Sequence, residues 1–558
     1  MSISRRSVLG VMAGVAPAII VRRATAAQAE GAQIAPGPFR GTRESLKDYQ
    51  VPNWYRDAKF GIWAHWGPES APEFGDWYAQ RMYIEGNPTY KYHLENYGHP
   101  SKFGYKDICR GVWKGNKFDP DSLMTLYKKA GAKYFVSMGV HHDNFDMWKS
   151  NHQPRWNAAA CGIKRDVVGA FRAAAQKQGL RFGVSEHLAR SFVWYAAAHG
   201  SDKSGSLAGV PYDGNDPAYA DLYHDYSKGA PQPATGRGIG STDIGPDWWQ
   251  REWFNRIKDL VDQYQPDLLY SDGRLPFESY GLSVVANLYN LSAQKHGGRV
   301  EAIYNSKLNT DCETGTCVLD LERTIVDRVW PAPWQTDTCV GNWHYLRGVK
   351  YKTPKVVIDM LVDVVSRNGN LLLNFPLPNS GELDAEELKI LEGITSWMAV
   401  NNEAIYGTRP WKMYGEGPTN PNPAMGGRGA EGRGALPPGG AAGTPGRGPG
   451  GQPLTAAEQA SRAARFGERS RPDLTPQDVR FTTKGSTLYA FVMGWPEKEA
   501  VIRPLGAKST QGVGKIRKVD LLGIKGNLKW TQADDALRIE VPPQKPCDYA
   551  VTFKITGA

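Results

Sequence analysis

Apolar runs of strand length alternate with amphipathic segments over roughly 350 residues, and this alternation constrains the fold more than any other feature of the chain. The runs are almost continuously apolar, as expected for strands covered on both faces. They span residues 60–67, 134–143, 181–188, 267–273, 301–306 and 370–377. Between two of them, Val167, Phe171 and Ala174 follow helical spacing, and Gly179 supplies a stop. An alternation of this length predicts a parallel α/β fold, specifically a (β/α)8-like (TIM) barrel.

The composition changes after the barrel and divides the rest of the chain into two parts. From about 416 to 453, Gly and Pro dominate and almost no apolar residue remains to be buried. We therefore expect a flexible linker or surface insertion over 412–474. Short β-rich runs separated by turns then predict an all-β sandwich domain over 475–558. The catalytic barrel domain is expected to span 40–411.

The first residues have the pattern of a removable export signal. Arg5 and Arg6 precede an uncharged stretch that is too short to span a bilayer, and small-residue cleavage sites follow. We expect residues 1–29 to be a twin-arginine signal, and the mature protein to be periplasmic or secreted from a bacterium. Without the four arginines of this segment the formal charge falls from +10 to +6, so no nucleic-acid partner is predicted. No membrane partner is predicted either, and nothing in the sequence indicates an oligomeric state.

The six cysteines are too few in a chain of this length to form a disulfide framework. Cys312 and Cys317 are close enough in sequence to bridge in an oxidising compartment. Two free buried thiols are the equal alternative.

Polar residues gather where the predicted strands end. In a parallel barrel the loops that leave these ends converge on the active site. The residues are His65, His141, His142, Glu186, His187 and Asp272. A single histidine at a strand end is commonly structural, but several at one level indicate a shared pocket. Their residue types would also suit zinc, so a metallohydrolase is an alternative.

Asp272 is the most informative of these residues. It ends a strongly apolar strand, where an unpaired buried carboxylate would be costly. A helix cap or turn is the structural alternative. Glu322 and Asp320 offer a second carboxylate downstream. Two carboxylates from different loops on one pocket are what glycoside hydrolysis requires.

Several blocks of the sequence together resemble the α-L-fucosidases of glycoside hydrolase family 29. They include "FGIWAHWG", "GDWY", "GVHHDNFDMW", "PDLLYSDG", "LVDVVSRNGNLLLN" and "NNEAIYGTRPW", and they cover roughly residues 50–411. The resemblance implies a barrel with a C-terminal β-sandwich and a retaining mechanism that needs neither a metal nor another cofactor. It implies a substrate that is a fucosylated oligosaccharide or glycoconjugate.

The resemblance also implies roles for individual residues. Asp272 corresponds to the nucleophile, and Glu322 is the best match for the acid/base, with Glu313 and Glu301 as rivals. The residues that would contact the sugar are His65, Trp77, His141, His142, Tyr270 and Trp343.

One block departs from the family pattern. Relatives commonly read "GVYYS" where this chain reads "GVSEHL", so Ser185, Glu186 and His187 stand where a sugar-binding tyrosine is expected. We predict that Glu186 and His187 contact the substrate, unless Glu186 only pairs with a neighbouring Arg or His. This change makes a related L-sugar, such as an α-L-galactoside, the alternative substrate. A non-catalytic carbohydrate-binding relative is the remaining possibility.

Overall fold

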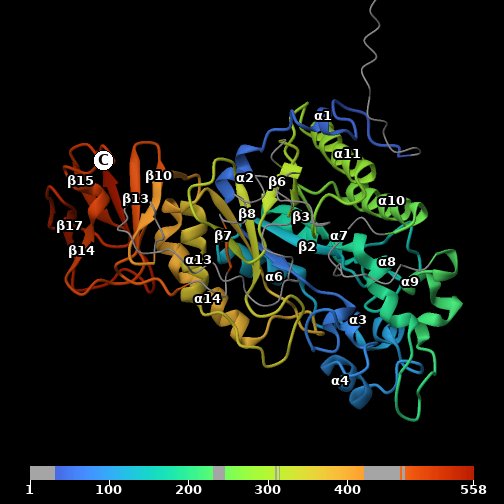
Figure 1. Cartoon of the computed structure of the whole chain (residues 1–558). Helices are drawn as coiled ribbons and strands as arrows, with labels where there is room; N and C mark the ends of the chain where they lie inside the picture. The colour runs from blue at the N-terminus through green and yellow to red at the C-terminus, as the bar shows by residue number, and fades with distance from the viewer. Residues whose placement is uncertain are drawn as a thin grey trace, which may run out of the picture.

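The computed structural model describes residues 32–229, 245–307, 311–312, 315–419, 465–467 and 472–557. Its main feature is a closed barrel of eight strands, each parallel to the next, with the last strand paired to the first (Figure 1). In barrel order the strands are β1 (Phe60–Ala64), β2 (Tyr134–Val140), β3 (Arg181–Glu186), β4 (Leu268–Ser271), β5 (Ile303–Ser306), β6 (Val318–Asp320), β8 (Trp334–Cys339) and β9 (Gly369–Asn374). The predicted TIM-like barrel is confirmed.

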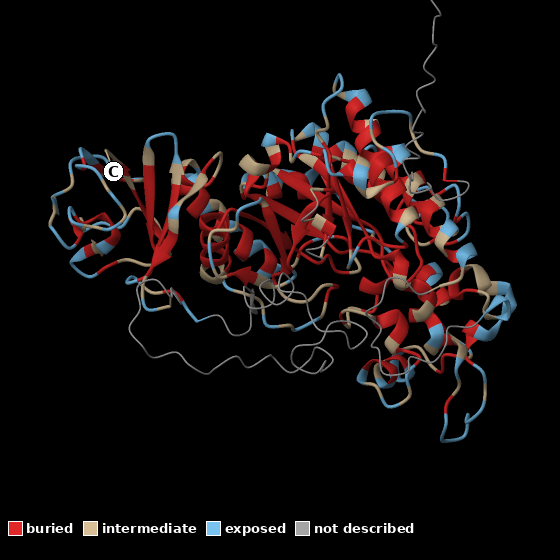
Figure 2. Ribbon diagram, turned by 45° about the horizontal axis from the view of Figure 1, so that its top comes forward, coloured by how far each residue is buried: buried red, intermediate tan, exposed pale blue. Residues whose placement is uncertain are grey.

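Burial explains why the strands are apolar on both faces. Every residue of β1, β2 and β4 is buried, between the barrel interior and the surrounding helices (Figure 2). The longer helices between and after the strands are α6 (Pro120–Lys129), α7 (Val167–Lys177), α10 (Asp247–Tyr264), α11 (Ser279–Lys295), α13 (Pro354–Ser366) and α14 (Ala385–Asn401). Helix α7 covers the predicted helical spacing, and the side chain of Asp166 caps its first turn by accepting from Gly169 N.

A separate antiparallel domain follows the barrel (Figure 1). One sheet has the order β10-β12-β13-β18-β15, and a second has the order β14-β17-β16. Phe481 and Phe553 from the first sheet share one core with Ile502 and Ile539 from the second, as expected for a sandwich. The strands are β10 (Arg409–Glu416), β12 (Val479–Lys484), β13 (Thr487–Val492), β14 (Glu499–Ile502), β15 (Lys518–Leu521), β16 (Trp530–Gln532), β17 (Leu537–Glu540) and β18 (Val551–Thr556).

The predicted segment boundaries compare with the structure as follows. Strand β10 belongs to the C-terminal sheet and lies across the boundary expected at 411–412. Most of the Gly/Pro-rich segment and the whole export signal lie outside the described residues, except that β11 (Arg465–Gly467) pairs with β7 (Thr324–Val326). Cys312 and Cys317 form a disulfide. Within the ranges described, no helix combines the length and hydrophobicity needed to cross a membrane.

Candidate active site

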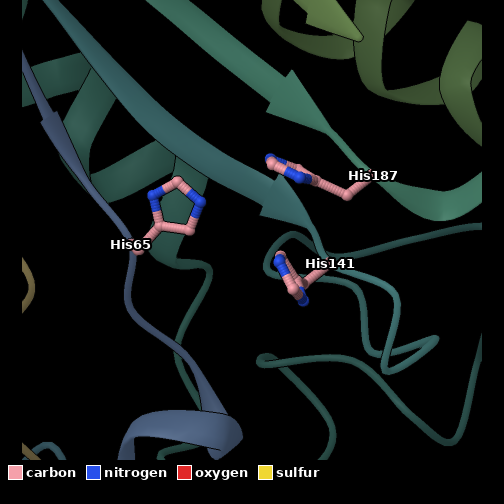
Figure 3. Close-up of side chains that lie close together, drawn as sticks. All are labelled: His65, His141 and His187. Atoms are coloured by element: carbon pink, nitrogen blue, oxygen red, sulfur yellow. The ribbon is translucent and has the colours of Figure 1, made fainter. Parts of the chain in front are cut away.

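A cavity of about 500 Å³ lies at the carboxyl end of the barrel, a size within the usual range for small-ligand sites. The residue that directly follows each of the first five barrel strands lines it, namely His65, His141, His187, Asp272 and Lys307. Figure 3 shows the three histidines, which extend from the ends of neighbouring strands. The other lining residues are Trp63, Asp76, Trp77, Arg81, His142, Arg190, Tyr270, Glu322, Asp337 and Trp343. All predicted site residues except Glu186 therefore meet in one cavity.

The carboxylate of Asp272 is surrounded by cationic and polar nitrogens. Its Oδ1 accepts a 2.7 Å hydrogen bond from Lys307 Nζ. Its Oδ2 lies 3.4 Å from His142 Nε2, 3.5 Å from His187 Nδ1 and 3.7 Å from Arg190 Nη1. Burial alone would raise the pKa of Asp272, but Lys307 and the two histidines hold it well below its ordinary value. The carboxylate is therefore ionised and available as a nucleophile.

Lys307 joins the two carboxylates that the sequence singled out. Its Nζ donates to Asp272 Oδ1 at 2.7 Å and to Glu322 Oε2 at 2.6 Å. The two oxygens therefore lie at most about 5.3 Å apart, the sum of these two distances. Retaining glycosidases hold their carboxyl groups about 5–5.5 Å apart, whereas inverting enzymes need about 6.5–9.5 Å. The upper limit of about 5.3 Å between Asp272 Oδ1 and Glu322 Oε2 is shorter than an inverting pair requires and agrees with the spacing of a retaining pair.

Glu322 is distinguished from the other carboxylates considered. It lies at the cavity, where Trp343 Nε1 donates to its Oε1 at 3.2 Å, and its side chain remains 40% exposed. Asp320 points into the barrel and accepts from Gln335 Nε2, and Glu301 pairs with Arg181 at the amino end of the strands. Glu313 lies outside the described residues.

The cavity histidines are mostly neutral. Burial lowers the pKa of His65 and His141 well below the ordinary value, and it lowers the pKa of His187 to about 4. His65 Nδ1 faces Asn374 Oδ1 at 3.2 Å, and the Asn374 amide donates to Trp343 O, which fixes its orientation. His65 Nδ1 therefore carries the proton and its Nε2 is an acceptor. A neutral imidazole that can donate on one nitrogen and accept on the other suits sugar hydroxyls.

Aromatic rings supply apolar surface around these polar groups. Trp63 and Tyr270 pack edge to face at 4.9 Å, and Tyr270 donates its hydroxyl proton to Asp337 Oδ2 at 2.9 Å. Trp77 has a left-handed backbone (φ 63°), a conformation that costs free energy for a bulky residue and is common at functional sites. Such rings stack on the apolar faces of sugars.

Glu186 was predicted to contact substrate, but it does not line the cavity. It is 1% exposed, and its Oε2 accepts from Trp253 Nε1 at 3.0 Å and from Leu188 N at 3.1 Å. The two neighbouring side chains at this strand end diverge: His187 faces the cavity, and Glu186, the last residue of β3, faces helix α10. The alternative prediction was that Glu186 pairs with a neighbouring Arg or His. The structure instead shows its carboxylate accepting from Trp253.

Burial raises the pKa of Glu186 to about 7, which makes the stability of the barrel depend on pH. Between pH 4.5 and 7 the folded protein keeps a proton that the unfolded chain has released, so the free energy of unfolding falls as pH rises. The loss is roughly 3 kcal/mol over this range. We expect Glu186→Gln to remove this contribution, so that the urea midpoint falls less between pH 5 and pH 8 in the variant than in the wild-type protein. Parallel pH dependence in both proteins would contradict the assignment.

Sequence reasoning missed several residues of the cavity. Lys307 follows β5 directly, so the strand-end pattern that identified the histidines could have found it. Arg190 lies in the turn η3 (Leu188–Arg190) beyond β3, and Asp337 lies within β8, which was not predicted as a strand. No simple sequence signal marks these two.

Three groups of described side chains bring potential metal-ligand atoms within 4.8 Å of one another. They are His65, His141 and His187; His142, His187 and Asp272; and Glu69, Asp76, His141 and His344. The first two consist of residues that line the cavity. The third combines two lining residues, Asp76 and His141, with the buried Glu69 and His344.

Comparisons with known proteins agree with this architecture. Residues 26–403 match the family model described as alpha-L-fucosidase, and residues 472–556 match its C-terminal domain. Human tissue alpha-L-fucosidase is 26% identical over 565 residues, which cover 97% of each chain. Human plasma alpha-L-fucosidase is 29% identical over 392 residues, 68% of this chain and 74% of the relative.

A solved structure shares the fold. The Thermotoga maritima alpha-fucosidase in complex with fucose superposes with a TM-score of 0.64 at 22% identity, covering 92% of this chain and 99% of that one. The barrel and the β-sandwich are therefore both present in this relative's architecture. Because the family model spans the whole barrel and its companion spans the sandwich, this chain belongs to the alpha-L-fucosidase family.

Proposed function

We propose that this chain removes terminal α-L-fucosyl residues from glycans by a double displacement with net retention. The observation that carries the proposal is the shared hydrogen bonding of Asp272 and Glu322 to Lys307, which limits the separation of their oxygens to about 5.3 Å. Membership of the alpha-L-fucosidase family indicates that the sugar is L-fucose.

Each carboxylate has a distinct task in this mechanism. Asp272, kept ionised by Lys307, attacks the anomeric carbon and forms a covalent glycosyl-enzyme. Glu322, at the more open side of the cavity, donates a proton to the departing oxygen. The same Glu322 then takes a proton from water, which attacks the anomeric carbon and releases the sugar.

The neutral imidazoles of His65 and His141 bind hydroxyls of the sugar, and Trp77 and Trp343 cover its apolar surface. Because these four side chains are uncharged, they do not require a charged substituent on the sugar. A fucosylated oligosaccharide or glycoconjugate is therefore the substrate class. The paired arginines Arg5 and Arg6 support twin-arginine export to the periplasm or the medium.

A related L-sugar, such as an α-L-galactoside, is the second candidate. The departure at 185–187 favours it, because His187 brings an imidazole to the cavity surface. Glu186 gives no further support, since its carboxylate bonds to Trp253.

Both candidates are tested by following para-nitrophenyl α-L-fucoside and α-L-galactoside with the mature protein. We expect faster turnover of the fucoside, and proton NMR of the first product should show the α-anomer. Initial release of the β-anomer would refute retention. Faster turnover of the galactoside would leave the proposed mechanism in place and identify L-galactose, not L-fucose, as the preferred sugar.

A further inference from the structure

A second pocket, of about 440 Å³, shares no lining residue with the cavity that holds Asp272 and Glu322, here called the sugar cavity. Its walls come from the connection between β1 and α6 and from the connection between β2 and α7. Of the residues that line it, Arg110, Arg155 and Lys164 are cationic and none is a carboxylate. We call it the basic pocket. Its volume is within the usual range for small-ligand sites.

Two of the three charges in the basic pocket have no anionic partner. Among the described residues, no carboxylate lies within ion-pair distance of Arg110 or Lys164. Arg155 differs, because its Nε lies 3.3 Å from Asp221 Oδ2 and its Nη1 donates to Ala218 O at 3.0 Å. Like charges that line one pocket repel each other, so an anion bound between them would lower the energy of all three.

Two aromatic rings hold the guanidinium groups of the basic pocket in place. The guanidinium carbon of Arg110 lies 4.6 Å from the ring centroid of Trp156 and 5.2 Å from that of Tyr219. That of Arg155 lies 5.5 Å and 5.9 Å from the same two centroids. Trp156 is fully buried and therefore forms a fixed support. An arginine that stacks on a ring still has its N–H groups available for an oxyanion, and it loses less freedom on binding.

The backbone on both walls of the basic pocket is unusual. Arg110 lies in the π-helix η2 (Ile108–Val112), a rare conformation that is frequent at functional sites. Lys164 has a left-handed backbone (φ 52°), which costs free energy in a residue with a Cβ atom. Local preference selects neither conformation, so the surrounding structure holds both walls in place.

The basic pocket shares its two loops with the sugar cavity. The connection that carries Arg110 also carries Trp77, and the connection that forms the other wall begins with His141. Tyr105, three residues before η2, donates to Asp143 Oδ2 at 2.6 Å and thereby joins the two connections. Both connections leave the carboxyl ends of neighbouring strands, so the basic pocket belongs to the same end of the barrel as the sugar cavity.

We propose that the basic pocket binds an anionic group, a sulfate ester or a carboxylate, on a sugar residue beyond the terminal fucosyl unit of the glycan. Guanidinium groups bind such oxyanions through paired N–H donors, and a lysine adds a compact positive charge. This inference rests on the proposed function for the identity of the glycan, and it narrows the substrate class to acidic fucosylated glycans. The reaction itself stays with Asp272 and Glu322.

Binding to the mature protein can be tested by ligand-observed NMR with probes that contain no fucose. Lactose sulfate offers a sulfate ester, sialyllactose offers a carboxylate, and lactose is the neutral comparison. At low ionic strength we expect an acidic probe to bind and lactose not to bind, with an affinity that falls as salt is added. The acidic probe with the lower Kd identifies the preferred anion. Absence of binding by both acidic probes would overturn the proposal.

Two variants locate the binding of the acidic probe. Arg110→Gln and Lys164→Gln each remove one charge from an exposed side chain, so both proteins should fold. Each should weaken binding by at least about 10-fold, the scale of losing one hydrogen bond to a charged group. Lys91→Gln removes an exposed charge from helix α4 (Pro88–Asn96) and should bind with the wild-type affinity. Wild-type affinity in both pocket variants would also overturn the proposal.

Two further measurements separate the basic pocket from the sugar cavity, which has cations of its own in Arg190 and Lys307. Excess L-fucose, which should fill the sugar cavity, is not expected to displace the acidic probe. Both pocket variants should hydrolyse para-nitrophenyl α-L-fucoside with the wild-type kcat/KM. Displacement of the probe by L-fucose would place it in the sugar cavity and refute the basic pocket. A wild-type protein that binds the probe but hydrolyses neither aryl glycoside would refute the proposed function and not the pocket.

Discussion

Replacement of Asp272 by Asn is expected to lower kcat for para-nitrophenyl α-L-fucoside on the order of 10⁴-fold, the scale of losing a central catalytic group. The amide keeps the shape of the side chain, but it cannot form the covalent intermediate that the ionised carboxylate forms. Asp267→Asn is the matched control. Asp267 directly precedes β4, pairs with Arg181 at 2.9 Å, and lies at the opposite end of the same strand.

Azide can identify Asp272 as the nucleophile through the stereochemistry of the product. In Asp272→Gly the space of the carboxylate is open, and azide can attack the anomeric carbon directly. One displacement inverts the centre, so the expected product is the β-L-fucosyl azide, identified by proton NMR. A nearly normal kcat for Asp272→Asn, or an α-azide from Asp272→Gly, would exclude this role.

The strand ends account for most of what the sequence could predict. His65, His141, His187 and Asp272 each directly follow a strongly apolar run, and a parallel barrel brings such positions to one rim. The same apolar runs therefore predict both the barrel fold and the position of the cavity at the ends of its strands. Lys307 follows the same rule, but a lysine at a strand end is easily taken for a surface residue.

Two barrel strands were missed, β8 because it does not read as apolar and β6 because it is short. All six residues of β8, "WQTDTC", are buried although four are polar. Several of these polar side chains form hydrogen bonds inside the barrel: Gln335 accepts from Tyr55 and donates to Asp320, and Asp337 accepts from Tyr270. Hydropathy cannot separate such a strand from a loop. The remaining strand, β6, has only three residues.

Neither the residues that meet in the cavity wall nor the direction of the Glu186 side chain could be predicted without the tertiary structure. Glu69 and His344 meet only because the barrel closes, and no sequence spacing connects two residues so far apart. For Glu186 and His187 the sequence could not state whether both face the cavity, since the adjacent His141 and His142 at the end of β2 both line it. The contact with Trp253 of α10 decides this.

Replacement of Glu322 by Ala should affect substrates according to their leaving groups. General acid catalysis contributes roughly 10²–10⁴-fold, so kcat/KM for a fucosyl oligosaccharide should fall by about that factor. An aryl fucoside with an acidic phenol needs little protonation, so its kcat/KM should fall much less. Its kcat should still fall, because Glu322 is also the base that activates water in the second step.

Azide again separates the roles, now with the opposite stereochemistry. In Glu322→Ala the carboxylate of Asp272 still forms the glycosyl-enzyme, and azide attacks that intermediate without needing a base. Two displacements restore the original configuration, so kcat should recover and the α-L-fucosyl azide should accumulate. Glu301→Gln is the control, since Glu301 pairs with Arg181 at the other end of the barrel. If Glu313→Ala rather than Glu322→Ala shows the leaving-group dependence and the α-azide, the acid/base is Glu313, and Glu322 only holds Lys307.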